Sequence, residues 1–259
     1  MLSVLSPAKT LDESSRLPTR KHSLPRLLEE SEKLIDVMVT KPAAEVAQLM
    51  HISPELGELN AQRYLDFTLP FTRRNARPAA FMFAGDVYQG LAAGTMSERD
   101  LTEAQKTVRI LSGLYGVLRP LDLMQPYRLE MGTRLTTSRG RSLYDFWGDT
   151  VSELLAADLD ASPGPQVLVN LASAEYFGVV RPSVLGARIV SPRFLDATGD
   201  AEPKIVSFYA KRARGAMAAW LVRERVRSVK ALYEFGADGY RYAPERSTPD
   251  QPTYVRRAA

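Results

Sequence analysis

The chain has 259 residues, with 34 lysines and arginines against 30 aspartates and glutamates, two histidines and no cysteine. The lack of cysteine excludes thiol peroxidases, thiol redox sensors and cysteine proteases, together with cysteine zinc sites and disulfides. With only His22 and His51, a multi-histidine metal centre is excluded as well. The length suits one large domain or two small ones, and the composition is that of a globular protein.

The sequence contains no pattern that predicts export or membrane insertion. Residues 1–5 are too short for the apolar region of a signal peptide, and no basic residue precedes them. The longest uncharged apolar runs, at 79–85 and 215–222, are far below the roughly 20 residues that a membrane helix needs. We therefore expect a soluble, cytoplasmic protein with no membrane partner.

Short apolar runs rich in β-branched or aromatic residues alternate irregularly with helical patterns. Strands are expected at Leu2–Leu5, Ala79–Phe83, Gln166–Asn170, Arg188–Val190, Lys204–Tyr209 and Gly239–Tyr242. Helices are expected at Leu24–Val39, from Pro54 after the N-cap Ser53, from a Ser97/Asp100 capping box to about Leu111, and at Leu143–Leu159 and Lys211–Lys230. This order predicts a mixed α+β or α/β fold rather than a bundle or a barrel.

Two segments of the chain hold the basic excess. Residues 204–230 contain eight lysines and arginines and one acid, and residues 106–141 contain seven against two. The remaining residues are therefore net acidic, although the whole chain carries a charge of +4. Such asymmetry is typical of proteins that bind a phosphate backbone, but arginine-rich helix faces can also be simply solvated.

The stretch from Leu111 to Pro120, Leu-Ser-Gly-Leu-Tyr-Gly-Val-Leu-Arg-Pro, follows an expected helix and contains two glycines. A glycine turn between two helices is typical of a helix-hairpin-helix, whose backbone N–H groups bind DNA phosphates without reading sequence. We predict such an element at about residues 101–125. The usual hairpin has its glycines two apart, whereas Gly113 and Gly116 are three apart, and an ordinary helix C-cap is the alternative.

Polar residues gather just past the ends of four expected strands, where α/β proteins build their sites. Their convergence predicts one pocket lined by Lys9, Asp86, Asn170, Ser173, Glu175 and Lys211. The alternative is that each residue caps a helix or forms an ion pair.

Several blocks of the sequence resemble the bacterial YaaA family, in order and over essentially the whole chain. They are Ser6-Pro-Ala-Lys-Thr-Leu11, Gly85-Asp-Val-Tyr88, Leu111 through Gly132, Phe146-Trp-Gly-Asp149, Asn170-Leu-Ala-Ser173 with Glu175-Tyr-Phe177, and Ser207-Phe-Tyr-Ala-Lys211 with Ala213-Arg-Gly215. The resemblance implies a single domain over 1–259, with a compact and unusual α/β fold, a mixed sheet, a helix-hairpin-helix-like element and a basic cleft. It further implies a cytosolic protein of the hydrogen peroxide stress response that binds DNA and helps to limit free iron and oxidative damage.

The resemblance also implies which residues bind DNA. Gly113, Tyr115, Gly116 and Arg119 match the hairpin, while Lys9, Lys211 and Arg214 match basic positions that we place in the cleft. The expected partner is duplex or junction DNA, bound independently of sequence through Gly113, Tyr115, Gly116, Arg119, Lys211 and Arg214. No catalytic activity, cofactor or metal is implied.

Two functional hypotheses of different classes remain open from the residues alone. The first is a non-catalytic DNA-binding stress protein. The second is an enzyme that acts on a small anionic or nucleotide-like substrate in the predicted pocket, with a lysine among carboxylates as acid, base or nucleophile. Direct iron sequestration is weaker, because the chain has no Glu-x-x-His pair, and we favour an indirect effect on iron.

Overall fold

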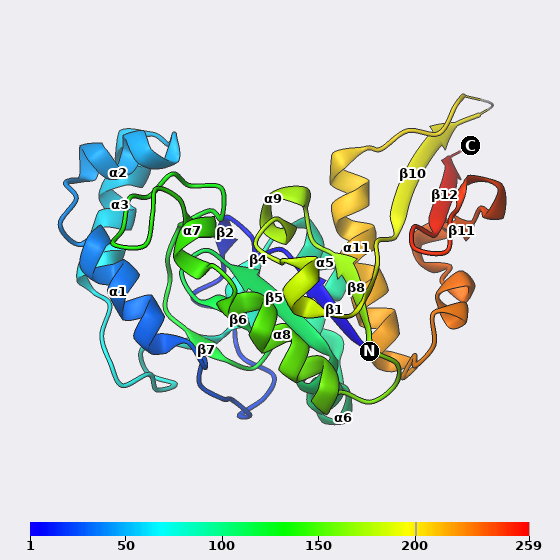
Figure 1. Cartoon of the computed structure of the whole chain (residues 1–259), viewed down its shortest axis with the longest axis horizontal. Helices are drawn as coiled ribbons and strands as arrows, with labels where there is room; N and C mark the ends of the chain where they lie inside the picture. Colours follow the sequence, from blue (N-terminus) through cyan, green and yellow to red (C-terminus); the bar gives the residue numbers. More distant parts are fainter. Residues whose placement is uncertain (200, 259) are drawn as a thin grey trace.

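A computed structural model describes residues 1–199 and 201–258 of the chain, and a five-stranded sheet lies at its centre (Figure 1). The strands lie in the order β6 (Gly116–Leu118), β5 (Val108–Ser112), β1 (Leu2–Leu5), β8 (Val167–Leu171) and β9 (Arg188–Val190). The pairs β1–β5, β1–β8 and β8–β9 are parallel, and β6 is antiparallel to β5. Every residue of β1 and β5 is buried, as expected for mostly apolar strands covered on both faces.

Eleven α-helices occur among the described residues. They are α1 (Leu28–Met38), α2 (Ala43–Met50), α3 (Pro54–Leu65), α4 (Ala79–Met82), α5 (Asp86–Leu91), α6 (Glu98–Thr107), α7 (Leu143–Trp147), α8 (Thr150–Ala161), α9 (Ala174–Phe177), α10 (Pro182–Leu185) and α11 (Ser207–Arg223). Figure 1 shows α1, α2 and α3 together at one end of the long axis, with the central sheet beside them.

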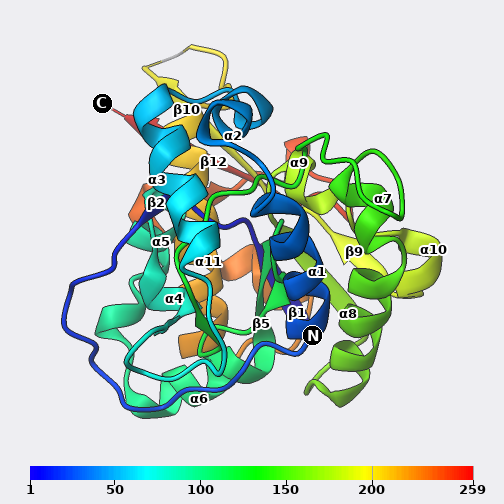
Figure 2. The same ribbon diagram turned by 90° about the vertical axis from the view of Figure 1, so that its left-hand side faces the viewer.

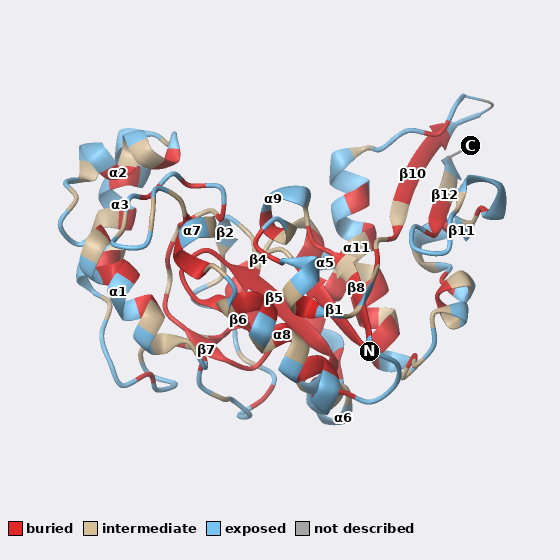
Figure 3. Cartoon of the chain, in the orientation of Figure 1, coloured by how far each residue is buried: buried red, intermediate tan, exposed pale blue. Residues whose placement is uncertain are grey.

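A second sheet ends the chain at the opposite end of the long axis (Figure 1). It consists of β10 (Arg193–Thr198), β12 (Thr253–Ala258) and β11 (Arg241–Tyr242), in that order. Two short pairs complete the strands: β2 (Thr10–Leu11) with β4 (Phe83–Ala84), and β3 (Arg77–Pro78) with β7 (Leu123–Met124). The predicted mixed α/β class is therefore confirmed, and Figure 3 shows that the buried residues concentrate in the central sheet.

The local capping signals are confirmed. The backbone N–H of Asp100 donates to Ser97 Oγ at 3.1 Å, and the N–H of Ser97 donates to Asp100 Oδ2 at 3.2 Å, which closes the capping box of α6. Ser53 caps α3 through the N–H of Leu56 at 3.4 Å, with Pro54 at the first helical position. These helix starts depend on neighbours in the chain, which is why the sequence predicts them.

Several predicted boundaries are wrong. The helix expected at Lys211–Lys230 ends at Arg223, and the one expected at Leu143–Leu159 is divided into α7 and α8 after Trp147. The expected strand Lys204–Tyr209 instead leads into α11 at Ser207, because Ala210, Ala213 and Met217 form a buried helical stripe that outweighs the strand propensity of the aromatic pair. The expected strand Ala79–Phe83 is mostly α4, with only its end in β4. The helix from Ser97 ends at Thr107 rather than Leu111, because β5 begins at Val108.

The predicted helix-hairpin-helix at 101–125 is not confirmed. After α6 the segment forms β5, a tight turn, β6 and then β7, so the glycine motif lies in a β-hairpin. Gly116 has a φ of +66°, which is strained for residues with a side chain and fits the turn between the two strands. The β-branched Val108, Ile110 and Val117 favour strands on both sides of that turn.

Helices α5 and α11 cross in direct backbone contact, and Figure 2 shows them side by side. A Cβ atom on Gly215 would lie 1.7 Å from the carbonyl oxygen of Val87, and one on Gly90 would lie 2.0 Å from that of Arg212. Only glycine at both positions permits this approach. The crossing fixes the start of α5 relative to the first turns of α11.

We expect Gly215→Ala to lower the free energy of unfolding by about 3 kcal/mol, because the added methyl group overlaps backbone atoms that cannot move independently. Gly94→Ala is the matched control, since a Cβ there meets nothing within 4 Å. It should change stability by less than about 0.5 kcal/mol. Urea denaturation followed by circular dichroism measures both, and equal stability of the two variants would contradict the proposed contact.

Candidate functional site

The order of the parallel strands creates a switch point between β1 and β8. From β1 the chain passes to β5 on one side, and then crosses to β8 and β9 on the other. In open α/β sheets, ligands bind in the crevice at the carboxyl ends of the two strands where this reversal occurs. The loop Ser6–Thr10 follows β1, and residues 172–176 follow β8, so both lie at this edge.

A cavity of about 360 Å³ opens at that edge, and we call it the switch-point cavity. It is lined by residues of both loops, of α5 and of α11. The structure brings five of the six predicted pocket residues to it: Lys9, Asp86, Ser173, Glu175 and Lys211. Sequence reasoning thus placed these side chains near one another, and their role in binding stays a prediction.

Asn170 is the exception, because its side chain is used within the fold. Its Nδ2 donates to Ser191 Oγ at 3.3 Å, and its Oδ1 accepts the N–H of Ala172 at 3.0 Å. These bonds shape the chain as it leaves β8. Asn170 does not line the switch-point cavity, so its effect on the site is confined to positioning the loop that carries Ser173.

Hydrogen bonds connect three of the elements that line the switch-point cavity, namely the loops after β1 and β8 and helix α5. Ser6 Oγ accepts the N–H of Ser173 at 2.8 Å, which joins the loops after β1 and β8. Tyr88 of α5 donates its hydroxyl to the carbonyl oxygen of Ser6 at 3.0 Å. Burial raises the pKa of Tyr88 well above its ordinary value, so the phenol stays neutral and keeps this bond.

A second cavity of about 540 Å³ shares Lys9 and Glu175 with the first. Within it, Glu130 accepts contacts from Lys9 at 3.3 Å and from Arg128 at 3.1 Å. Glu175 accepts the N–H of Gly132 at 3.1 Å. His51 and Arg134 also line it and were missed from the sequence, because no motif connects them to the strand ends.

Asp86 and Lys211 differ from these paired groups. Over residues 1–199 and 201–258, neither side chain makes an ion pair or a side-chain hydrogen bond, although both line the switch-point cavity. Asp86 is half-buried and Lys211 is exposed. A carboxylate and an ammonium group are therefore available there to a ligand that carries both hydrogen-bond donors and negative charge.

The residues predicted to form a DNA-binding hairpin are mostly enclosed in the protein. Tyr115 is fully buried, and Gly113 approaches Leu129 so closely that a Cβ would lie 2.1 Å from its carbonyl oxygen. The ring of Trp147 packs over Gly116, and its Nε1 donates to the carbonyl oxygen of Gly113 at 3.0 Å. The glycines therefore serve packing, and the buried hairpin presents no free row of N–H groups.

The other predicted DNA-binding residues, Arg119, Arg214 and Lys211, differ in their exposure and in their partners. Arg119 forms an ion pair with the buried Asp122 at 2.9 Å and also donates to the carbonyl oxygen of Leu24. Arg214 lies one turn after Lys211 on α11, and burial lowers the pKa of its guanidinium. Lys211 alone among them is exposed at the rim of a cavity.

Much of the charge in the two basic segments is neutralised by ion pairs, most of them with acids from elsewhere in the chain. Arg109 is buried and contacts Asp158 at 2.6 Å, an acid that also binds Arg26 at 2.7 Å. Further arginines of these segments form ion pairs: Arg128 with Glu130, Arg139 with Glu30, Arg212 with Asp238, Arg225 with Asp100, and Arg227 with Glu103. The local excess therefore overstates the free positive charge.

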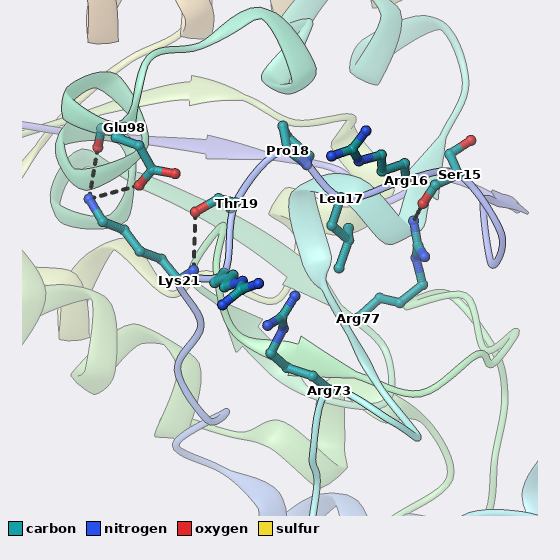
Figure 4. A pocket seen from close by; sticks show the side chains of 10 residues that line it. Ser15, Arg16, Leu17, Pro18, Thr19, Lys21, Arg73, Arg77 and Glu98 are labelled. Atoms are coloured by element: carbon teal, nitrogen blue, oxygen red, sulfur yellow. Dashed lines mark hydrogen bonds and ion pairs between the residues drawn. The ribbon is translucent and has the colours of Figure 1, made fainter.

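Free positive charge gathers instead in a hollow of about 720 Å³, which we call the basic hollow. Its charged lining consists of Arg16, Arg20, Lys21, Arg73, Arg77 and Glu98. Figure 4 shows Lys21 turned toward Glu98 and Arg77 bonded to the backbone of Ser15. In the described part of the chain, Arg16, Arg20 and Arg73 make no ion pair.

Sequence reasoning missed the basic hollow because its two halves are far apart in the chain. Arg16 and Arg20 lie in the segment between β2 and α1, whereas Arg73 precedes β3. Each stretch contains too few basic residues to stand out as a basic segment in the sequence. The fold joins them, partly because Arg77 donates to the carbonyl oxygen of Ser15 at 2.6 Å and holds the first segment against β3.

Comparison with known proteins identifies the family. The profile of the peroxide stress protein YaaA family matches residues 1–246. The chain belongs to the YaaA family. A UPF0246 protein of Ralstonia nicotianae is 52% identical over 259 residues, covering all of both chains, and one of Cellvibrio japonicus is 48% identical over 256 residues, covering 99% of this chain and 98% of its own. The resemblance stated from the motifs is confirmed.

Among residues 1–199 and 201–258, none of the helices combines the length and apolar character needed to span a bilayer.

The buried Asp158 gives a pH-dependent test that Arg109 belongs to the core. Burial alone would raise the pKa of Asp158, but hydrogen bonds from Arg26 and Arg109 outweigh it and hold the pKa below its ordinary value. The stability from this carboxylate is therefore fully present above its unfolded pKa of about 3.9 and is lost as pH falls through the lower folded pKa. Asp158→Asn should cost about 3 kcal/mol at pH 7, because it leaves Arg109 buried without its counter-charge.

Urea titrations of wild type and Asp158→Asn from neutral to acid pH measure this cost. The difference between the two proteins should shrink below about pH 4, as the wild-type carboxyl group takes up its proton. Asp160→Asn, at an exposed position on the same helix, is the control and should leave stability unchanged. A constant difference across the pH range would show that the Asp158 charge does not stabilise the fold.

Proposed function

We propose that this YaaA-family protein acts in the peroxide stress response by binding DNA, independently of sequence, through the basic hollow. The observation that carries the proposal is the convergence of five basic side chains on one open hollow with a single acid, Glu98. Three of the five, Arg16, Arg20 and Arg73, are exposed and make no ion pair within the described residues. Guanidinium groups bind phosphate oxygens in bidentate geometry, which suits a backbone contact that reads no sequence.

In this proposal the basic hollow takes the role first assigned to the glycine hairpin. The hairpin is instead part of the buried central sheet. Arg119 forms an ion pair with Asp122. Lys211 would add an exposed positive charge near the start of α11. Bound DNA would be shielded from oxidants in the cytoplasm, and any limit on free iron would be an indirect outcome. Groups of three or more His, Asp or Glu side chains placed to hold a metal do not occur among the described residues.

The second candidate is an enzyme for a small anionic or nucleotide-like substrate in the switch-point cavity. The observation that favours it is the pair Asp86 and Lys211, which line the cavity without a partner in the described structure. Lys211 would bind the anionic group, while Asp86 would accept hydrogen bonds or a proton. Lys211→Met, with its fold intact, should abolish turnover or ligand-induced stabilisation in a thermal shift screen of nucleotides; a wild-type protein that responds to none of them would count against this candidate.

The DNA proposal predicts a specific loss when one free arginine is neutralised. Arg73→Gln should weaken binding of a blunt duplex several-fold and reduce the slope of log affinity against log salt by about 1, because one phosphate contact is lost. Fluorescence anisotropy titrations at several salt concentrations measure both quantities.

Lys230→Gln is the matched control for that experiment, because it removes the same charge from an exposed position outside the basic hollow. It should leave affinity and salt slope near the wild-type values. If Lys230→Gln weakened binding as much as Arg73→Gln, net charge rather than the basic hollow would account for DNA binding. If neither variant altered binding, the assignment of the basic hollow would be wrong.

A further inference from the structure

A third hollow adjoins both the basic hollow and the switch-point cavity. This middle hollow, of about 330 Å³, shares Ser15, Arg16 and Arg77 with the basic hollow. It also shares Ala84 and Gly85 with the switch-point cavity. The three hollows therefore adjoin one another in a row across β4, and we call the row the trench.

The middle hollow differs chemically from its two neighbours. Its lining includes Phe81, Phe83 and Tyr88, of which Phe83 and Tyr88 are buried and Phe81 is half-buried. The one acid in it, Asp12, is already engaged by the N–H groups of Ser14 and Ser15 at 3.1 and 2.9 Å. An aromatic side chain thus lies beside two arginines in this hollow, and its one carboxylate is held by backbone N–H groups.

This sequence of surfaces matches the parts of a nucleotide strand. Arginines bind phosphates, an aromatic side chain stacks on any base, and together they form the usual platform for single-stranded nucleic acid. Paired bases in a duplex are already stacked on one another and present only their edges, so they cannot lie against Phe81. The far end of the trench offers Lys211 for a phosphate and Asp86 for base or sugar donors.

A second aromatic side chain marks that far end. Phe208 is 48% exposed and precedes Lys211 by three residues, so the two share a face of α11. Phe208 does not line the switch-point cavity, but an exposed aromatic side chain close to Lys211 is the kind of group on which a base can stack.

We propose that the trench binds unpaired nucleotides of DNA, with phosphates in the basic hollow, a base stacked on Phe81, and the following nucleotide at Lys211 and Asp86. This inference rests on the proposed DNA binding and adds that strand ends or unpaired tails are preferred over a fully paired duplex. The specificity is for the unpaired state of the base, and not for its identity.

The test compares a blunt duplex with the same duplex carrying a single-stranded tail, by fluorescence anisotropy with the full-length protein. Wild type should bind the tailed duplex about tenfold more tightly. Phe81→Leu should remove that difference, because it keeps the apolar contact but not the ring face, whereas Phe81→Trp should keep it. Arg73→Gln should weaken both ligands alike.

Each outcome decides one claim. Equal wild-type affinity for the two duplexes, or a tail preference that survives in Phe81→Leu, overturns the trench. Loss of the tail preference in Phe81→Leu, with Arg73→Gln still weakening both ligands, supports it. A wild-type preference for the tail without any effect of Arg73→Gln would overturn the basic hollow as the phosphate site, and with it the proposed function.

A second measurement does not depend on the folding of Phe81 variants. A fluorescent adenine analogue placed in the tail should change its emission when wild type binds, because the base stacks on protein, and the same analogue within the duplex should not. Unchanged emission from the tail overturns the proposal. A free mononucleotide that competes as well as the tail would also overturn it, since the cavity alone would then be the binding site.

Discussion

The contact between α5 and α11 at Gly90 and Gly215 is the constraint on which the candidate site depends. Two helices that meet backbone to backbone have no side chains to compress, so their relative position is set by hard contacts. Asp86 begins one helix and Lys211 lies one turn before Gly215 on the other. The crossing therefore sets the distance between the two unpaired charges, those of Asp86 and Lys211, in the switch-point cavity. Tyr88 of α5 also donates a hydrogen bond to Ser6, so the position of α5 in turn fixes the loop after β1.

The glycines at 113 and 116 serve a different purpose, and they show why a glycine motif is ambiguous. In a DNA-binding hairpin, glycines allow the backbone to approach a phosphate. Here Gly113 allows the backbone to approach Leu129, and Gly116 takes a positive φ beneath the ring of Trp147. The requirement for a missing Cβ is the same in both cases, so the residue type alone could not distinguish protein packing from ligand binding.

What the sequence predicts and what it misses follow from the range of the interactions involved. Capping at Ser97 and the buried strand β1 depend on near neighbours, and Lys9 and Ser173 meet because both follow parallel strands of the central sheet. Asp86 and Lys211 reach the same cavity through the crossing of α5 and α11, because the strands expected before them do not form as predicted. Charge is less predictable, because Arg109 is neutralised by Asp158 from another element. The basic hollow joins stretches between β2 and α1 and before β3, which no local pattern connects.

The location of unpaired charge also relates the two candidate functions to each other. The charge runs in the sequence predicted that the free basic residues would lie on helix faces. When residues in ion pairs are left out, the unpaired arginines of the basic hollow lie at one end of the trench, and Asp86 and Lys211 lie at the other. A protein with no cysteine has no thiol with which to reduce peroxide, so a protective role must come from binding or from other chemistry. A nucleotide held at Asp86 and Lys211 by a strand anchored in the basic hollow would be in reach of acid–base groups. DNA binding and action on a nucleotide, as proposed, would then use adjoining hollows of one surface.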